Sequence, residues 1–150
     1  MTFSSVNELL DFAISKEEAA AKFYTELAGK MDKPYMRTVF EEFAREEAGH
    51  KKKLLEIKSG ELLLPVAAKV ADLKITEHVT EVTPTPELDY QQALILAMKQ
   101  EKAAFKLYND LAETAGDDSL RATLLGLAQE EAKHKLRFEI EYDECFLTEN

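Results

Sequence analysis

Two Glu-x-x-His motifs, Glu47 with His50 and Glu131 with His134, are the part of this sequence best suited to chemistry. On an α-helix, residues three apart lie about 60° apart around the axis and one turn along it. Both side chains of each motif can therefore reach the same metal pair. Carboxylate and imidazole together suit iron or manganese, and they can also hold zinc. The motifs thus indicate metal chemistry, provided that they face the inside of the fold.

Apolar spacing places both motifs on the inner faces of long helices, because each motif continues a seam with spacings of three and four residues. Two further seams each carry one glutamate, so four glutamates and two histidines point inward. The four predicted seams are Leu10, Ala13, Glu17, Ala20, Tyr24 and Leu27; Phe40, Phe43, Glu47, His50 and Leu54; Leu94, Ala97, Glu101, Ala104, Tyr108 and Leu111; and Leu124, Leu127, Glu131, His134 and Phe138.

Four inward carboxylates need a source of positive charge. An unpaired buried ion costs several kcal/mol, unless it is protonated or balanced. Two divalent cations would supply +4 against −4, with both histidines neutral, which is the form of imidazole that binds metal. The sequence therefore predicts two metal ions in the core of a helical bundle.

The same seams decide between neighbouring glutamates. Glu46 shares a stripe with Glu42 and Lys53, which predicts a solvated face. Glu18 is replaced by Lys102 at the corresponding position of the second half, so an acid is not required there. We therefore expect Glu46 and Glu18 to lie outside the metal site, and their substitution by alanine to be nearly silent.

The sequence contains two copies of one unit, residues 1–58 and 85–142, at an offset of 84. Residues 17–28 match residues 101–112 at seven of twelve positions, and the pattern AxEEAxHK recurs at the same offset. Each copy predicts two helices. The first helix of each copy begins at a capping box, Ser5 with Glu8 and Asp89 with Gln92.

The connection between the copies, residues 59–88, is long enough to be a crossover. The second helix is predicted to begin at Pro34 and to end before Gly60, and the fourth follows Gly116. A helix of about 25 residues spans about 37 Å, a length along which the 30 connecting residues can return. A short helix is expected behind Pro65. The predicted fold of residues 1–150 is one all-α domain, a ferritin-like four-helix bundle with one long crossover between its second and third helices.

Composition excludes several other functions. With 19 Lys and Arg against 29 Asp and Glu, the net charge of −10 repels nucleic acid and anionic membrane surfaces. The only cysteine, Cys145, allows no internal disulfide and no cysteine-built metal site. The sequence has no apolar run of about 18 residues and no signal-like N-terminus. We expect a cytoplasmic protein without a nucleic-acid or membrane partner.

The four segments together resemble the rubrerythrin branch of the ferritin-like superfamily. The single-glutamate helices read EEAAAKFY and EKAAFKLY, and the other two read EEAGH and EEAKH. The resemblance implies a di-iron centre bridged by Glu47 and Glu131, with manganese or zinc as substitutes. Its implied ligands are Glu17, Glu47, His50, Glu101, Glu131 and His134.

Two features depart from the rubrerythrin pattern. Rubrerythrins carry a cysteine-ligated rubredoxin domain that supplies electrons, which a chain with one cysteine lacks. They also tend to carry a further glutamate one turn after the ligand on the third helix, where this chain has Ala104. Electrons must therefore come from a separate donor.

Tyrosines and alanines flank the predicted ligands. Tyr24 and Tyr108, seven residues after Glu17 and Glu101, are either half-buried core residues or hydrogen-bond donors to the ligands. The sequence leaves both readings open. Ala20 and Ala104 leave room for dioxygen or peroxide, although alanine is also simply a good helix former.

These residues predict an oxidoreductase that reduces hydrogen peroxide or dioxygen with electrons from an external donor, such as a rubredoxin-like protein. The alternative is a non-cage protein that binds iron through ferroxidase chemistry, because the acidic surface attracts Fe²⁺ and only about ten residues follow the fourth helix. We expect a homodimer, in which the second helix pair docks on its own first pair or is swapped onto that of its neighbour.

Overall fold

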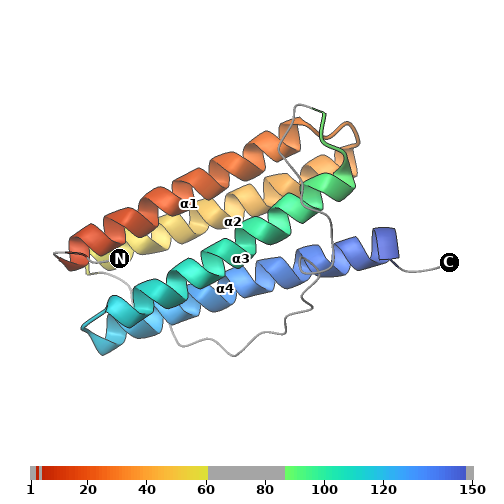
Figure 1. Cartoon of the computed structure of the whole chain (residues 1–150). Helices are drawn as coiled ribbons and strands as arrows, with labels where there is room; N and C mark the ends of the chain where they lie inside the picture. The colour runs from red at the N-terminus through yellow and green to blue at the C-terminus, as the bar shows by residue number, and fades with distance from the viewer. Residues whose placement is uncertain (1–2, 4, 61–86, 148–150) are drawn as a thin grey trace.

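The computed structural model describes residues 3, 5–60 and 87–147. Within these ranges the chain forms four α-helices and a short π-helix, and no strand. The elements are α1 (Val6–Gly29), α2 (Pro34–Lys58), α3 (Tyr90–Thr114), α4 (Asp118–Tyr142) and η2 (Asp143–Leu147). The predicted all-α class and four-helix bundle are confirmed (Figure 1).

The helices begin at the predicted caps. The side chain of Ser5 accepts a hydrogen bond from the backbone of Glu8 at 3.1 Å. The side chain of Asp89 accepts one from the backbone of Gln92 at 2.8 Å, and the Gln92 side chain accepts one from the backbone of Asp89 at 3.1 Å. These bonds satisfy N–H groups that have no partner inside the helix, which fixes the first residue of α1 and α3.

Helix bounds recur at the offset of the sequence repeat. Helix α1 begins at residue 6 and α3 at residue 90, which is 84 later. Helix α2 spans residues 34–58 and α4 spans residues 118–142, again 84 later at both ends. Each copy of the repeat therefore folds into the same pair of helices.

Within each copy the two helices pack closely on one another, α1 on α2 and α3 on α4, whereas α1 and α3 touch at only a few places. Helices α2 and α3 run in the same direction, so α2 ends at the end of the bundle opposite to the start of α3 (Figure 1). This is the arrangement that the length of the connection, residues 59–88, predicts. Most of this connection, with the short helix expected behind Pro65, lies outside the described residues.

The core consists of two apolar clusters, one toward each end of the bundle. One contains Phe40 and Phe138, and the other contains Leu54 and Leu127. Burial of each such side chain contributes about 1.5–3 kcal/mol. Along every helix the predicted inward glutamates and histidines fall between the two clusters, and every predicted seam residue is buried except Ala104, which is half-buried. A polar layer thus crosses the middle of an otherwise apolar interior.

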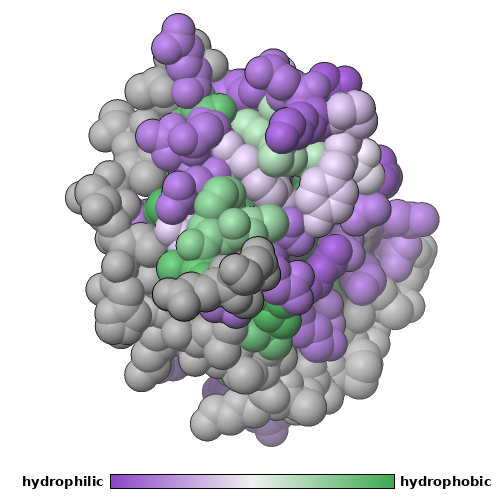
Figure 2. Space-filling model, turned by 90° about the vertical axis from the view of Figure 1, so that its right-hand side faces the viewer, coloured by the Kyte–Doolittle hydropathy of each residue, from purple (hydrophilic) through white to green (hydrophobic). Residues whose placement is uncertain are grey.

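One end of the bundle combines polar and apolar side chains. Figure 2 shows the end of the bundle where α2 and α3 begin, at which hydrophilic side chains surround small apolar groups. Large apolar side chains that remain exposed on α2, α4 and η2 near this end are Tyr35, Ile140, Phe146 and Leu147. Among the described residues, no helix has the length and apolar character needed to cross a membrane.

Candidate metal centre

All six predicted ligands meet in the polar layer, and all are at most 4% exposed. Their donor atoms form two groups, in each of which the atoms lie within 4.8 Å of one another. One group is Glu17, Glu47, His50 and Glu131, and the other is Glu47, Glu101, Glu131 and His134. Glu47 and Glu131 belong to both groups, which is the position that a bridging carboxylate requires.

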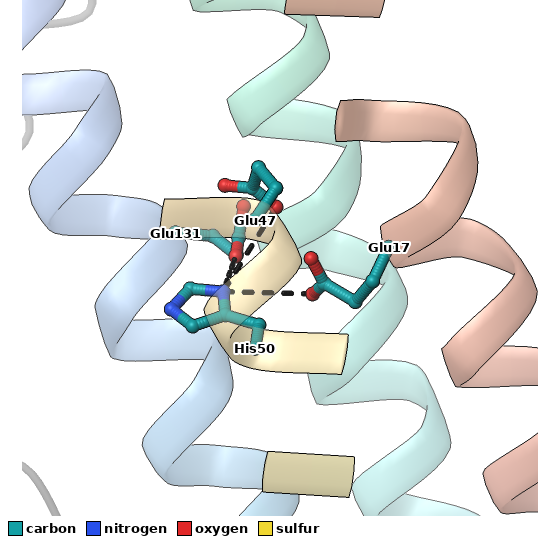
Figure 3. A group of neighbouring side chains, drawn as sticks. All are labelled: Glu17, Glu47, His50 and Glu131. Atoms are coloured by element: carbon teal, nitrogen blue, oxygen red, sulfur yellow. Dashed lines mark ion pairs between the residues drawn. The ribbon is translucent and has the colours of Figure 1, made fainter. Parts of the chain in front are cut away.

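The imidazole of His50 turns one ring nitrogen toward three carboxylates (Figure 3). Its Nδ1 lies 2.8 Å from Glu131, 3.6 Å from Glu17 and 3.9 Å from Glu47. These residues come from α4, α1 and α2, so three helices must pack in register to form the group.

The second group repeats this geometry around His134. Its Nδ1 lies 2.8 Å from Glu47, 3.6 Å from Glu101 and 4.0 Å from Glu131. The two imidazole rings are stacked, with centroids 5.5 Å apart and planes 4° apart. In both groups the shortest contact joins the histidine of one repeat to the Glu-x-x-His glutamate of the other.

Both tyrosines donate hydrogen bonds to carboxylates of this cluster. The hydroxyl of Tyr24 donates to Glu101, and that of Tyr108 donates to Glu17 at 2.5 Å. Each bond again joins one repeat to the other. The sequence left open whether these tyrosines are core residues or hydrogen-bond donors to the ligands. They are both, and their side chains are fully buried.

Glu46 contacts the site, which the sequence analysis missed. One of its carboxylate oxygens lies 2.8 Å from Nε2 of His134, the ring nitrogen that faces away from the cluster. Arg137 holds the same carboxylate with two contacts of 3.0 Å and stacks its guanidinium 4.3 Å from the ring centre of Phe43. Glu46 therefore orients His134, and the expectation of a purely solvated residue is wrong.

Glu18, by contrast, lies on the surface as expected. Its carboxylate is 2.8 Å from the ammonium of Lys51, and both side chains are substantially exposed. The signal that separates Glu46 from Glu18 is chemical. A histidine that binds metal through one nitrogen needs an acceptor at the other, and Glu46 is close enough to supply it.

Comparison with known proteins identifies the family. The rubrerythrin family model matches residues 8–142, which include both motifs and both single-glutamate helices. The chain belongs to the rubrerythrin family. None of the curated proteins compared with this member of the family matches it.

Two solved structures share its fold. One is an uncharacterized conserved protein from Magnetospirillum magnetotacticum, with 23% identity and a TM-score of 0.71, covering 93% of this chain and 95% of the other. The second is a hypothetical protein from Pyrococcus furiosus, with 26% identity and a TM-score of 0.65, covering 93% and 89%.

Burial and mutual repulsion govern ionisation at the centre. Burial, together with neighbouring carboxylates, raises the pKa of Glu47 and of Glu131 far above the ordinary glutamate value. Burial opposes the charged form of His134, but the carboxylates of Glu101, Glu46 and Glu47 beside its ring outweigh this effect and raise its pKa to about 12. The hydrogen bond with His134 also lowers the pKa of Glu46 to about 2. Without metal, the layer holds its charges only by keeping protons.

The donor atoms fit a pair of divalent cations. Six donor atoms of the cluster are buried and make no well-aligned hydrogen bond to any described group. They are Nδ1 of both histidines and one carboxylate oxygen of each of the four glutamates. Buried polar atoms almost always have a partner, so six such atoms that converge on two points require an explanation. Two divalent ions would supply a partner for these atoms and would balance the four carboxylates.

The metal-free protein should lose stability as the pH rises from about 5 to 8. Folded Glu47, Glu131 and His134 retain protons that the unfolded chain releases above its own pKa values of about 4.3 for glutamate and 6.5 for histidine, so higher pH favours unfolding. Urea unfolding of metal-free protein measures this slope. The Glu47→Gln/Glu131→Gln variant should flatten it, and a wild-type stability that is constant or rising over this range would contradict the assignment.

Loss of Glu46 should weaken metal binding without abolishing it. Removing the partner of a ligating histidine typically lowers metal affinity 10- to 100-fold, and we expect Glu46→Ala to fall in this range. Glu130→Ala is the matched control, because Glu130 occupies the same position in the other repeat and pairs with Lys133 at 3.2 Å. Glu46→Gln should recover most of the affinity. Equal effects of Glu46→Ala and Glu130→Ala in a metal titration would refute the role of Glu46.

Proposed function

We propose that this protein is a di-iron oxidoreductase that reduces hydrogen peroxide or dioxygen with electrons from an external donor. The observation that carries the proposal is the pair of overlapping ligand groups that share Glu47 and Glu131. Shared carboxylates would hold two metals side by side, and membership of the rubrerythrin family supports iron as the metal. Manganese or zinc would fit the same mixture of oxygen and nitrogen donors as substitutes.

A ferrous pair held by these residues would supply two electrons to an O–O bond, which converts peroxide to water. The protein provides the surroundings of that reaction. Tyr24 and Tyr108 fix the orientation of Glu101 and Glu17 through their hydroxyls. Glu46 fixes that of His134. The apolar clusters on both sides bury the ligands, which strengthens the electrostatic contacts between them.

The second candidate is iron oxidation by a protein that does not form a cage. It is supported by the net charge of −10, which attracts Fe²⁺ to the surface. The two functions differ in what they consume. A ferroxidase oxidises many Fe²⁺ ions per chain. A peroxidase oxidises its own two metals once, and an electron donor must reduce them before the next turnover.

Partners of the proposed reaction are peroxide or dioxygen, a separate electron donor such as a rubredoxin-like protein, and a second copy of the chain. A homodimer, with or without exchange of helix pairs, retains the complete ligand set in each site. Light scattering distinguishes it from the particle of about two dozen chains expected of a cage ferritin.

Loss of a shared glutamate should destroy the pair. We expect Glu47→Ala and Glu131→Ala each to lower bound iron from two ions per chain to one or none, because each removes a ligand from both groups. Glu18→Ala is the control and should retain two. Iron is measured by metal analysis of protein prepared without oxygen. A Glu47→Ala protein that still binds two irons would show that the ligand register is wrong.

The proposed activity is tested by stopped-flow absorbance of ferrous protein mixed with hydrogen peroxide or air-saturated buffer. Oxidation of the bound iron should be at least tenfold faster than that of free Fe²⁺ at the same pH, with two irons oxidised per peroxide. The protein should then return to the ferrous state with an added electron donor. If neither oxidant reacts faster than with free Fe²⁺, the proposal is lost; many Fe²⁺ ions oxidised per chain would favour ferroxidase chemistry instead.

A further inference from the structure

A cavity of about 350 Å³ lies between α1 and α3, two helices that touch at only a few places. Three pairs of residues at the repeat offset of 84 line it, so the two helices contribute equivalent positions to its walls. The pairs are Lys16 and Gln100, Ala19 and Ala103, and Ala20 and Ala104. Because four of these six residues are alanines, the helices leave space here that larger side chains would fill.

The cavity reaches the metal centre. Glu17 and Glu47 line it, and these side chains are only 2% and 1% exposed. Oε2 of Glu17 makes no hydrogen bond to the described residues, whereas its Oε1 accepts one from Tyr108. Oε1 of Glu47 lies 2.8 Å from Nδ1 of His134. Two buried carboxylates, one of them with an unpartnered oxygen, therefore belong to the wall of a space whose other lining residues are Phe12, Leu107, Tyr108 and the alanines, with Lys16 and Gln100. A molecule in this space lies against the ligands.

A second cavity, of about 260 Å³, reaches the centre from the side of α2 and α4. Its lining is charged or polar almost throughout and consists of Glu46, Gly49, His50, Lys53, Glu130 and His134. Ions, water and protons suit this side. The cavity between α1 and α3 differs because alanine, phenylalanine and leucine make up most of its walls, which favours an apolar molecule.

The volume of the apolar cavity distinguishes small from large candidate substrates. A volume of about 350 Å³ corresponds to about twelve water molecules at ~30 Å³ each. Hydrogen peroxide, with two heavy atoms, would occupy a small part of it and would gain nothing from apolar walls. Pockets that bind small organic ligands begin at about 300 Å³. The cavity thus matches an organic molecule that carries a reactive oxygen group at one end.

We propose that this site reduces organic hydroperoxides, R–O–O–H, whose apolar chain lies in the cavity between α1 and α3. The proposal rests on the proposed peroxidase function and specifies its substrate. The O–O bond breaks, the oxygen attached to carbon leaves as the alcohol R–OH, and the terminal oxygen leaves as water. Two electrons come from the reduced metal pair, which the external donor restores, and two protons come from solvent.

The kinetic test uses ferrous protein and the series hydrogen peroxide, ethyl, n-butyl and n-hexyl hydroperoxide in stopped flow. The three organic members share one reacting group, so differences between them report the chain. The second-order rate constant should rise about fourfold per methylene, the ratio that corresponds to ~0.8 kcal/mol per buried CH₂. Equal rate constants for ethyl and hexyl hydroperoxide, with hydrogen peroxide reacting fast, would overturn this proposal and leave the peroxidase function standing. No reaction with any member would overturn both.

Filling the cavity should remove the dependence on chain length. Ala104→Leu, at a half-buried position, and Ala19→Leu, at an exposed one, should each lower the ratio of hexyl to hydrogen peroxide rate constants at least tenfold. The second variant serves if the first does not fold. Ala48→Leu is the control, because Ala48 is exposed on α2 and does not line the cavity. Ratios that stay at the wild-type value in both cavity variants would show that the alkyl chain of the hydroperoxide does not bind in this cavity.

Binding is measured separately from activity. In zinc-loaded protein with ¹³C-methyl alanine, 1-hexanol as an unreactive analogue should shift the methyl signals of Ala19, Ala20, Ala103 and Ala104. The methyl signal of Ala48 should not move. Absence of shifts at the four cavity alanines, up to the solubility limit of 1-hexanol, would rule out the cavity as the chain-binding site even if organic hydroperoxides react.

Discussion

Four carboxylates share the apolar middle of this bundle with two imidazoles, and the need to neutralise them constrains everything else. An apolar cluster lies on each side of the layer along the bundle, and the ligands are at most 4% exposed, so water screens the charges little. In the absence of metal, Glu47 and Glu131 must keep protons, which their raised pKa values express. Metal binding replaces those protons with charge that the ligands share, so metal affinity and folding stability are linked in this protein.

The two repeats are bound to one another through this layer. His50 contacts Glu131, His134 contacts Glu47, and each tyrosine donates to a glutamate of the other repeat. Neither helix pair can satisfy its own polar groups alone, and the centre exists only where the two pairs dock. The two repeats also face one another across the site, which explains why equivalent alanines of α1 and α3 line the cavity.

Local sequence rules predicted most of the fold because they describe interactions within one helix. Spacings of three and four residues placed Glu47 and His50 on one inner face, and capping chemistry fixed the start of α3 at Asp89. Contacts between helices could not be obtained in this way. The contact of Glu46 with His134 depends on how α2 and α4 are rotated about their axes relative to one another. The charged residues on the same stripe of α2 as Glu46 predicted only that its side chain is exposed to solvent. Lys135 and Glu139 form an ion pair of 3.2 Å within α4, which local spacing allows, but its burial depends on the neighbouring helices, because a pair four residues apart on one helix is usually exposed.

The central claim is that the polar layer is a two-metal site with two shared glutamates. Its most direct test is anomalous diffraction at the iron absorption edge from crystals of protein loaded with ferrous iron without oxygen. The account predicts two separate iron peaks per chain, one beside Nδ1 of His50 and one beside Nδ1 of His134, with Glu47 and Glu131 contacting both. A single peak, or iron bound only at surface carboxylates, would contradict it.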